Sequence, residues 1–327
     1  MQQYGEDVVN AFKIGYKGRP PPMQPEHPYW HANERKYADL DPSKIPLTES
    51  LEDCMIRAKV LFDEKMKADI EMGKNVLVVA HANSLRGLIK NLEQLGDDEI
   101  SDVTIPNGIP LVYEFDSNMK IIPRAGAIPP LRGEYLEKRG LFKAVLQREK
   151  ELSSAAAAAA AATAAAASTS QSLYLLEADN VKESETTPPA QQPLSNHQNP
   201  SQVLFNTVEY GIATNLGSDL PLPEKKRDLE SLKARPQYLV LLRHGKTEHN
   251  RLGLFTGWED VPLIDQGRAE ARKAGEVLKL HGIELDVVYT SWLSRAIETA
   301  WIVLNELDSM WLPIVKTWRL NERMVMP

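Results

Sequence analysis

The chain of 327 residues contains a single cysteine, Cys54. One cysteine excludes an intrachain disulfide and a zinc site built from several thiolates, and it is typical of a reducing compartment. The sequence also lacks a long run of mixed apolar residues of the kind that spans a membrane. Its start includes Glu6 and Asp7 and no apolar stretch, unlike a signal or transit peptide. We therefore expect a cytoplasmic protein without a membrane anchor.

The chain also lacks an excess of basic residues. The chain has 38 Lys and Arg against 45 Asp and Glu, which gives a formal net charge of −7. A general nucleic-acid or anionic-membrane binder presents a basic surface. We therefore expect neither a nucleic acid nor a membrane as partner, although a small basic pocket for an acidic metabolite is compatible with this balance.

The composition divides the chain into three regions. Residues 1–150 and 236–327 have the mixed composition of globular protein, whereas residues 151–235 resemble a linker. The alanine-rich stretch 155–167 favours helix but offers no large side chain for packing. The polar, proline-rich stretch 186–193 is typical of disorder. We therefore predict two globular segments joined by an Ala-rich and then Pro/Ser-rich disordered linker.

Periodicity predicts alternating helices and strands in both globular segments. In the first, Ser50 is a plausible N-cap with Asp53 three residues later, and apolar residues follow at helical spacing. Alternating strands and helices favour an α/β fold with three layers, in which helices cover both faces of a mostly parallel sheet. We expect helices at 48–62, 84–95, 133–150, 265–281 and 294–307, and strands at 76–80, 111–115, 238–242, 287–289 and 314–315.

Two of the predicted strands end at a histidine. An apolar run leads to Arg243-His244-Gly245, and another leads to His81. Ligands of such sheets bind beyond the carboxyl ends of the strands, so both imidazoles are expected there. A neutral imidazole nitrogen attacks and leaves phosphorus readily near neutral pH. The pair therefore suggests phosphoryl transfer through histidine.

Phosphoryl transfer also needs positive charge and an acid. Negative charge spreads over the equatorial oxygens during attack, and Arg243 and Arg295 can clamp those oxygens, with Arg86 as an additional cation. His81 can supply a further hydrogen-bond donor. Glu322 follows the last predicted strand and is the candidate that protonates the departing oxygen.

An ordered series of motifs resembles the cofactor-dependent phosphoglycerate mutases of the histidine phosphatase superfamily. Motifs of that family's first half stand late in this chain, and motifs of its second half stand early. The first set is Leu241–Asn250, Phe255–Trp258, Asp265–Gly267, Thr290–Ala300 and Leu320–Arg323. The second set is Tyr4–Glu6, Pro20–Pro22, Leu47–Leu51, Val79–Arg86 and Ile105–Tyr113.

The resemblance implies a fold, a reaction and a set of roles. The fold would be phosphoglycerate mutase-like, and the enzyme would be an isomerase that interconverts 3-phosphoglycerate and 2-phosphoglycerate. It would be primed by 2,3-bisphosphoglycerate and would use no metal. His244 would become phosphohistidine, Arg243, Arg295 and His81 would hold the phosphoryl group, and Glu322 would be proton donor and acceptor. The substrate pocket would be lined by Thr247, Asn250, Thr256, Gly257, Arg323 and Asn83.

The swapped order of the halves allows two accounts. In the first, the domain is circularly permuted and the linker joins the old ends. In the second, the chain is a slice of a tandem protein. Residues 1–150 are then the C-terminal half of one mutase domain, and residues 236–327 are the N-terminal half of the next. Permutation at exposed sites is tolerated, so either account can place both halves in one sheet. We favour the slice, because the sequence loses part of a segment after Arg323 that the family uses to bind substrate, and because residues 133–150 resemble a natural charged C-terminal helix.

Two further departures bear on substrate binding. Lys13 stands where the family has a carboxylate-binding arginine, and lysine keeps the charge but loses the planar fork. Lys246 stands where the family commonly has glutamate.

Phosphoglycerate mutase in glycolysis is the expected function. The alternatives are a histidine-phosphatase-type phosphomonoesterase and a non-catalytic fragment of a tandem mutase. The expected partner is a small phosphorylated acid, with self-association or pairing with an adjacent mutase repeat left open.

Overall fold

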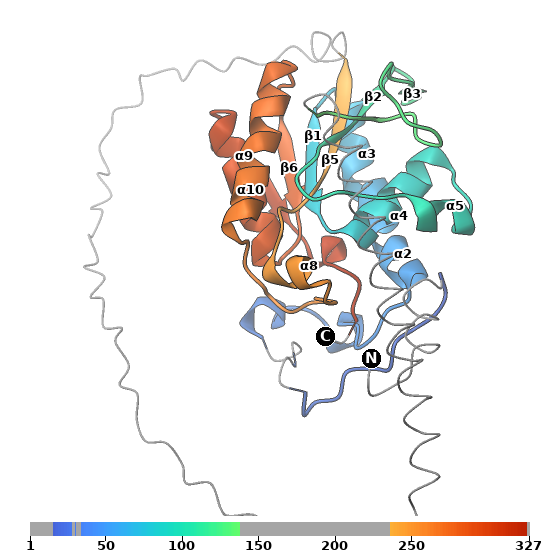
Figure 1. The fold of residues 1–327 in the computed structure, drawn as a ribbon. Helices are drawn as coiled ribbons and strands as arrows, with labels where there is room; N and C mark the ends of the chain where they lie inside the picture. Colours follow the sequence, from blue (N-terminus) through green and yellow to red (C-terminus); the bar gives the residue numbers. More distant parts are fainter. Residues whose placement is uncertain (1–15, 28–29, 31–33, 138–235, 326–327) are drawn as a thin grey trace, which may run out of the picture. The chain divides into compact units, whose positions relative to one another are not determined.

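A computed structural model describes residues 16–27, 30, 34–137 and 236–325. Its central feature is one mixed sheet with the strand order β3-β2-β5-β1-β6-β7, in which β4 also pairs with β2 (Figure 1). The strands β5, β1, β6 and β7 are parallel, and β2, β3 and β4 are antiparallel to their neighbours. The strands are β1 (Val76–Ala80), β2 (Leu111–Phe115), β3 (Ile121–Ile122), β4 (Glu134–Tyr135), β5 (Gln237–Arg243), β6 (Val287–Thr290) and β7 (Ile314–Lys316).

The two globular segments build this sheet together. Strand β1 from the first segment lies between β5 and β6 from the second, with Val76 opposite both Leu239 and Val287. Every residue of β1 is buried, as expected for a strand covered on both faces. The predicted α/β fold with a mostly parallel sheet is therefore confirmed, and each segment needs strands of the other to complete it.

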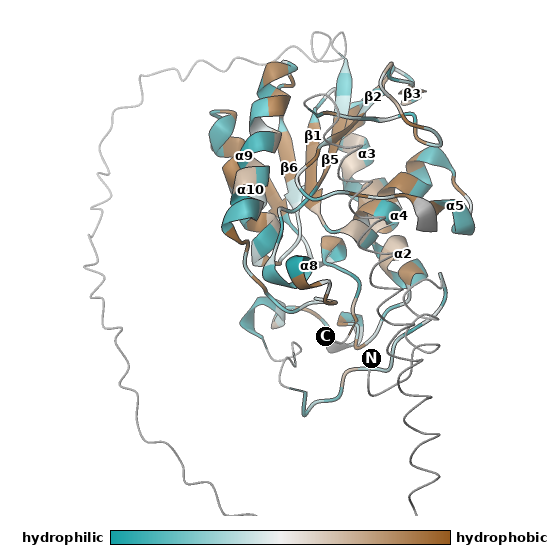
Figure 2. Cartoon of the chain, viewed as in Figure 1, coloured by the Kyte–Doolittle hydropathy of each residue, from teal (hydrophilic) through white to brown (hydrophobic). Residues whose placement is uncertain are grey.

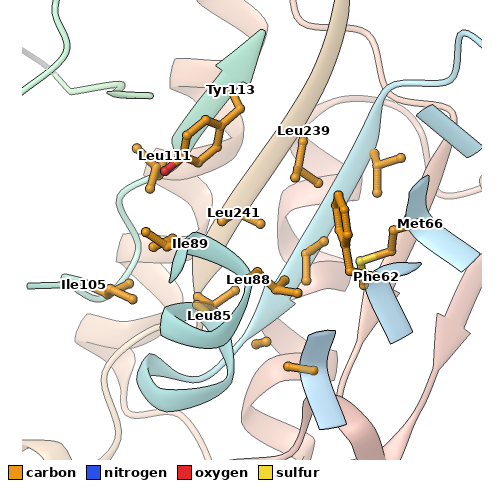
Figure 3. Packing of buried hydrophobic residues seen from close by; sticks show 14 of the residues in the cluster. Phe62, Met66, Leu85, Leu88, Ile89, Ile105, Leu111, Tyr113, Leu239 and Leu241 are labelled. Carbon is orange, nitrogen blue, oxygen red and sulfur yellow. The ribbon is translucent and has the colours of Figure 1, made fainter. Parts of the chain in front are cut away.

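Side chains of the central strands alternate between two cores. Val76 and Val78 of β1 pack with α2 and α4 on one face, whereas Leu77 and Val79 pack with α9 and α10 on the other. Figure 2 shows the apolar strands between helices whose outer faces are polar, and Figure 3 shows the first core around Leu241. The helices are α2 (Leu51–Leu61), α3 (Lys67–Glu71), α4 (Ala82–Glu93), α5 (Asp97–Asp102), α8 (Glu248–Leu252), α9 (Asp265–Leu280) and α10 (Ser294–Glu306).

The predicted strands and most predicted helices are found within a few residues of their expected bounds. Ser50 caps α2 and forms the expected reciprocal hydrogen bonds with Asp53. The helix continues beyond its predicted end, through a π-helical turn, η4 (Phe62–Met66), into α3. Short 3-10 turns, which periodicity does not reveal, are η2 (Arg35–Tyr37), η3 (Pro42–Lys44) and η5 (Trp318–Leu320).

One predicted helix is wrong at its start. Residues 133–150 were expected to be helical, but Glu134 and Tyr135 form β4 against Leu111 and Val112 of β2. The strand is favoured because it buries the Tyr135 ring, whose hydroxyl donates to the carbonyl of Thr104 at 2.9 Å. The remainder of that helix, from residue 138, and the predicted linker lie outside the described residues.

Candidate active site

The two strand-end histidines lie beside each other. Because β1 and β5 are adjacent and parallel, with Ala80 opposite Arg243, the residues that follow them emerge at the same edge of the sheet. The ring centroids of His81 and His244 are 4.8 Å apart, and both side chains are buried. The backbone N–H of His244 donates to the carbonyl of Ala80 at 3.0 Å and fixes this alignment. A sequence separation of more than 160 residues is thus closed by one strand pairing.

His244 uses its Nδ1 on its own backbone. Nδ1 lies 2.7 Å from the carbonyl oxygen of Gly245. A carbonyl can only accept, so Nδ1 carries the hydrogen and the neutral ring keeps its lone pair on Nε2. Burial, and then the charges of Arg295 and Arg243, hold the pKa of His244 well below its usual value. The ring is therefore neutral at pH 7, which is the state of a nucleophile.

The loop after His244 passes extremely close to the start of α9. A Cβ on Gly245 would lie 2.1 Å from the carbonyl oxygen of Gly267, and a Cβ on Gly267 would lie 2.1 Å from that of Lys246. The Gly245 N–H donates to Thr299 Oγ1 at 3.0 Å, and that hydroxyl donates to the carbonyl of Arg295 at 2.7 Å. Both glycines are needed because two backbones cross here, and the hydrogen bond to Thr299 ties the loop after His244 to α10.

His81 contacts the end of β6 instead of its own backbone. Its Nε2 is 2.8 Å from Ser291 Oγ, and its Nδ1 is buried without a hydrogen-bond partner among the described residues. Burial lowers the pKa of His81 well below its usual value, and the charge of Arg295 adds to this effect. His81 therefore keeps one ring nitrogen, Nδ1, without a protein partner among the described residues, next to the ring of His244.

Arginine side chains surround the two rings and are held mainly by backbone carbonyls. Buried Arg295 donates to the carbonyls of Glu259 and Gly257 at 2.8 and 3.0 Å, and burial lowers its pKa to about 10. Arg243 donates to the carbonyl of Ile105 at 2.9 Å. No carboxylate of a described residue forms an ion pair with Arg295, so its charge is available to an anion. Because carbonyl groups orient Arg295 without neutralising its charge, the site favours an anionic ligand.

Glu322 lies in the loop after η5 and meets Asn83 from α4. Its Oε1 accepts from Asn83 Nδ2 at 2.8 Å and from the backbone N–H of Arg323 at 2.7 Å. The Asn83 Oδ1 in turn accepts from Arg86 at 3.1 Å, and burial lowers the pKa of Arg86. Glu322 is half-buried, so a ligand can reach it.

The Glu322 loop is fixed by a buried ion pair that sequence reasoning missed. Arg57 of α2 pairs with Glu49 at 2.7 Å and donates to the carbonyls of Arg319, Asn321 and Glu322 at 2.8 to 3.0 Å. Glu49 also accepts from the N–H of Met324 at 2.8 Å. Glu49 belongs to the Leu47–Leu51 motif, which was the only available signal. Residues of the first segment thus hold the loop that carries Glu322 in the second.

Aromatic side chains pack against the Glu322 loop. Tyr37 stacks on Trp258 with centroids 5.1 Å apart and lies 5.5 Å from Trp292. Trp258 Nε1 donates to the carbonyl of Glu322 at 2.7 Å, and Asn321 Nδ2 donates to the Tyr37 hydroxyl at 3.2 Å. This small core of both segments contacts the backbone carbonyl of Glu322, which also accepts from Arg57.

The remaining predicted pocket residues lie around the histidines. Thr247 and Asn250 cap α8 reciprocally at 3.2 Å, and Asn107, which sequence reasoning missed, donates to the carbonyl of His244 at 2.7 Å and faces Asn250. Thr256 is buried beside Gly257, which adopts a φ of 51° and contacts the carbonyl of Val325 so closely that a Cβ would lie 2.2 Å from it.

Arg323 is buried next to Glu322, and burial lowers its pKa. The structure therefore brings the predicted residues of the described ranges to one edge of the sheet. Lys13 lies outside those ranges.

The described part contains neither a metal-binding cluster nor a membrane-spanning helix. No group of three or more His, Cys, Asp or Glu side chains there is arranged to hold a metal ion. No helix in these ranges is long and apolar enough to cross a lipid bilayer.

A three-layer α/β fold with paired histidines at the carboxyl edge of the sheet defines a class of protein. A sequence profile of the histidine phosphatase superfamily (branch 1) matches residues 15–125 and 239–326, which is more than half of the chain. The chain belongs to the histidine phosphatase superfamily. The match in two segments fits a permuted or split arrangement of the domain.

Two curated relatives indicate which members of this superfamily the chain resembles. The chain is 61% identical over 85 residues to a 2,3-bisphosphoglycerate-dependent phosphoglycerate mutase of Nocardia farcinica (strain IFM 10152), which covers 26% of this chain and 35% of the relative. It is 56% identical over 85 residues to the protein of the same name from Baumannia cicadellinicola subsp. Homalodisca coagulata, which covers 26% and 36%. The matches thus span about a third of the length of these relatives, and the predicted resemblance to such mutases is confirmed over that part.

Proposed function

We propose that the chain is a phosphoglycerate mutase that interconverts 3-phosphoglycerate and 2-phosphoglycerate, in glycolysis and gluconeogenesis, through a phosphohistidine at His244. The observation that carries this proposal is the 4.8 Å pairing of His244 with His81 beside Arg295. A neutral nucleophile, a second imidazole and an arginine without an ion pair are the groups that attack on a phosphoryl group requires. The names of the curated relatives support the choice of substrate.

In the proposed reaction, His244 Nε2 attacks phosphorus while the bond from phosphorus to the leaving oxygen breaks. Glu322, in its protonated form, gives its proton to that oxygen, and the product leaves as an alcohol. Arg243, Arg295 and His81 hold the three equatorial oxygens as charge develops on them. In the second half-reaction, Glu322 takes the proton from the hydroxyl of the acceptor, whose oxygen attacks the phosphohistidine. The neutral imidazole of His244 is then restored.

The pocket is proposed to fit a compact polyanion. Thr247, Asn250, Thr256, Gly257, Arg323 and Asn83 are the proposed substrate contacts, with Lys13 as a further one. 2,3-Bisphosphoglycerate supplies the phosphoryl group that first loads His244. The buried Nδ1 of His81, which has no hydrogen-bond partner among the described residues, and the charge of Arg295, which no described carboxylate pairs with, support its fit. Glycerate phosphates carry phosphate and carboxylate groups that such donors bind.

The proposal retains the predicted organisation of the chain. Residues 1–150 act as the C-terminal half and residues 236–327 as the N-terminal half of a mutase domain, with the linker at 151–235. One chain can supply both histidines, because β1 and β5 of the same chain pair. The proposed site therefore does not require self-association or pairing with an adjacent repeat.

Intact-mass analysis after incubation with 2,3-bisphosphoglycerate tests the proposal. We expect one added phosphoryl group, located on His244 by fragmentation and absent from the His244→Gln variant. A coupled assay should then show formation of 2-phosphoglycerate from 3-phosphoglycerate that depends on the bisphosphate. Release of inorganic phosphate without isomerisation would identify a phosphomonoesterase, and folded protein with an unmodified His244 would identify a non-catalytic fragment.

A further inference from the structure

We infer that Ser291 is a positioning residue that fixes His81 as an Nδ1–H donor toward the anion bound between the two histidines. The inference deepens the proposed function and rests on it for the identity of the anion. It begins from one contact, the 2.8 Å distance between His81 Nε2 and Ser291 Oγ at the end of β6.

The hydrogen bonds around Ser291 determine which group donates. The backbone N–H of Leu293 donates to Ser291 Oγ at 3.2 Å, so this oxygen already accepts one hydrogen bond. Its own hydrogen then has one acceptor within reach among the described residues, the Nε2 of His81. If Ser291 donates to Nε2, the proton of the neutral His81 ring must be on Nδ1.

The opposite tautomer leaves more groups unsatisfied. If Nε2 carried the proton and donated to Ser291, the serine hydrogen would have no acceptor in the described structure. The Nδ1 lone pair of His81 would also remain buried without a donor. With the proton on Nδ1, a single group is unsatisfied in the absence of ligand. Because each buried polar group without a partner costs free energy, the Nδ1–H tautomer is favoured.

The Nδ1–H of His81, which is left without a partner, can attract an anion at this position. His81 is fully buried, and its ring lies within the electrostatic influence of Arg295, His244 and Arg243. An N–H donor among cations attracts an anionic oxygen, whereas a lone pair in the same place would repel it. Ser291 thus determines whether the second imidazole attracts or repels a phosphoryl group, although it need not touch that group itself.

A matched control is provided by Ser84. This serine is also fully buried and contacts His81, but through the backbone: its Oγ accepts from the His81 N–H at 3.3 Å and faces the carbonyl of Leu320 at 3.1 Å. Ser84→Ala therefore removes a buried hydroxyl beside His81 without altering the contact of the ring. Ser291→Ala removes the hydroxyl that contacts the ring.

The test is long-range ¹⁵N NMR of histidine-labelled full-length protein, which distinguishes protonated from unprotonated ring nitrogens without turnover. His81→Phe identifies the His81 signals by their loss. In the wild type and in Ser84→Ala we expect His81 to be protonated at Nδ1, and in Ser291→Ala we expect a mixture of tautomers. Inorganic phosphate should bind about tenfold more weakly to Ser291→Ala than to Ser84→Ala, because a charge-assisted hydrogen bond is weakened.

Three results would overturn the inference: a wild-type His81 protonated at Nε2, a Ser291→Ala variant that keeps the Nδ1–H tautomer, or equal phosphate affinities in the two serine variants. The tautomer is measured in the resting protein. An unphosphorylated His244 would therefore refute the proposed transfer reaction while leaving the role of Ser291 intact.

Discussion

His81 and His244 occupy equivalent positions on neighbouring strands, but they use opposite nitrogens to contact the protein. His244 donates from Nδ1 to the carbonyl of Gly245, and His81 contacts Ser291 through Nε2. The nitrogen that remains is Nε2 in His244 and Nδ1 in His81. The difference shows that the end of a strand brings a histidine to the site, whereas its nearest hydrogen-bond partner determines what the ring can do there.

The strongest test of this comparison replaces each ring. We expect His244→Gln to reduce phosphoryl transfer by at least about 10⁴-fold, as for the loss of a nucleophile. His81→Phe should reduce it by roughly 10²- to 10³-fold, as for the loss of one donor to the transition state. His81→Asn, which places an amide donor near the position of Nδ1, should recover part of this loss. The rates are measured by the coupled mutase assay.

Mass spectrometry provides the control for these variants. His81→Phe should still acquire a phosphoryl group on His244, only more slowly, whereas His244→Gln should not acquire one. Equal losses of rate in His81→Phe and His244→Gln, with no phosphorylation of either, would contradict the division of roles between the two histidines.

A second test addresses the acid that the proposed reaction requires beside both rings. Arg57→Met should lower the free energy of unfolding by about 3–5 kcal/mol, because it leaves the carboxylate of Glu49 buried without its partner and releases the carbonyls of the Glu322 loop. The double variant Glu49→Gln/Arg57→Met should be less destabilised than Arg57→Met. Urea unfolding followed by circular dichroism measures these differences.

The exposed pair of Arg19 and Asp53 is the matched control for this test. Arg19 is 61% exposed, and a solvent-exposed ion pair contributes little to stability because water screens it. Arg19→Met should therefore leave the free energy of unfolding nearly unchanged. An equally small change for Arg57→Met would show that the Glu322 loop does not depend on the buried pair.

The smallest expected effect is on the pH dependence of stability, to which the two histidines should contribute alike. Burial lowers the pKa of both rings well below the value of about 6.5 for a histidine in the unfolded chain. As the pH falls below that value, the unfolded state binds protons that the folded state does not bind, so stability is lost. Each ring should contribute about 1.4 kcal/mol per pH unit.

Urea unfolding between pH 7 and pH 5 measures this dependence. His81→Phe and His244→Phe should each show a shallower decline in stability with falling pH than the wild type, by similar amounts. An unchanged pH dependence in either variant would mean that its ring binds protons alike in the folded and unfolded states, which would contradict a pKa lowered by burial.

Local sequence rules predicted the elements that depend on local chemistry. Ser50 and Asp53 cap α2 as expected, and the apolar run before His81 forms a buried strand. Residues 133–150 show where such rules fail. Their charged, helix-compatible pattern competes with a free position beside β2, and pairing with β2 buries Tyr135. Pairing between distant segments overrides local preference because it satisfies backbone hydrogen bonds and buries side chains at once.

The sequence predicted the residues of the candidate site better than the contacts between them. The motifs indicated both histidines, Arg295 and Glu322, and the structure gathers them at one edge of the sheet. The buried pair that fixes the Glu322 loop was not foreseen, because its partners Glu49 and Arg57 lie in the other segment and a buried charge has no periodic signature. The crossing at Gly245 was likewise invisible, since it depends on a contact with Gly267.

The sequence by itself determined that two apolar strands end in histidine and that arginines and one glutamate accompany them, because side-chain chemistry and local periodicity are properties of the chain. Only the tertiary structure decided that β1 inserts between β5 and β6 and so brings the rings to 4.8 Å. It also decided which nitrogen of each ring is occupied, since that depends on the Gly245 carbonyl in one case and on Ser291 in the other. Strand order and hydrogen-bond partners arise from burial and geometry between distant residues, and a linear pattern does not contain them.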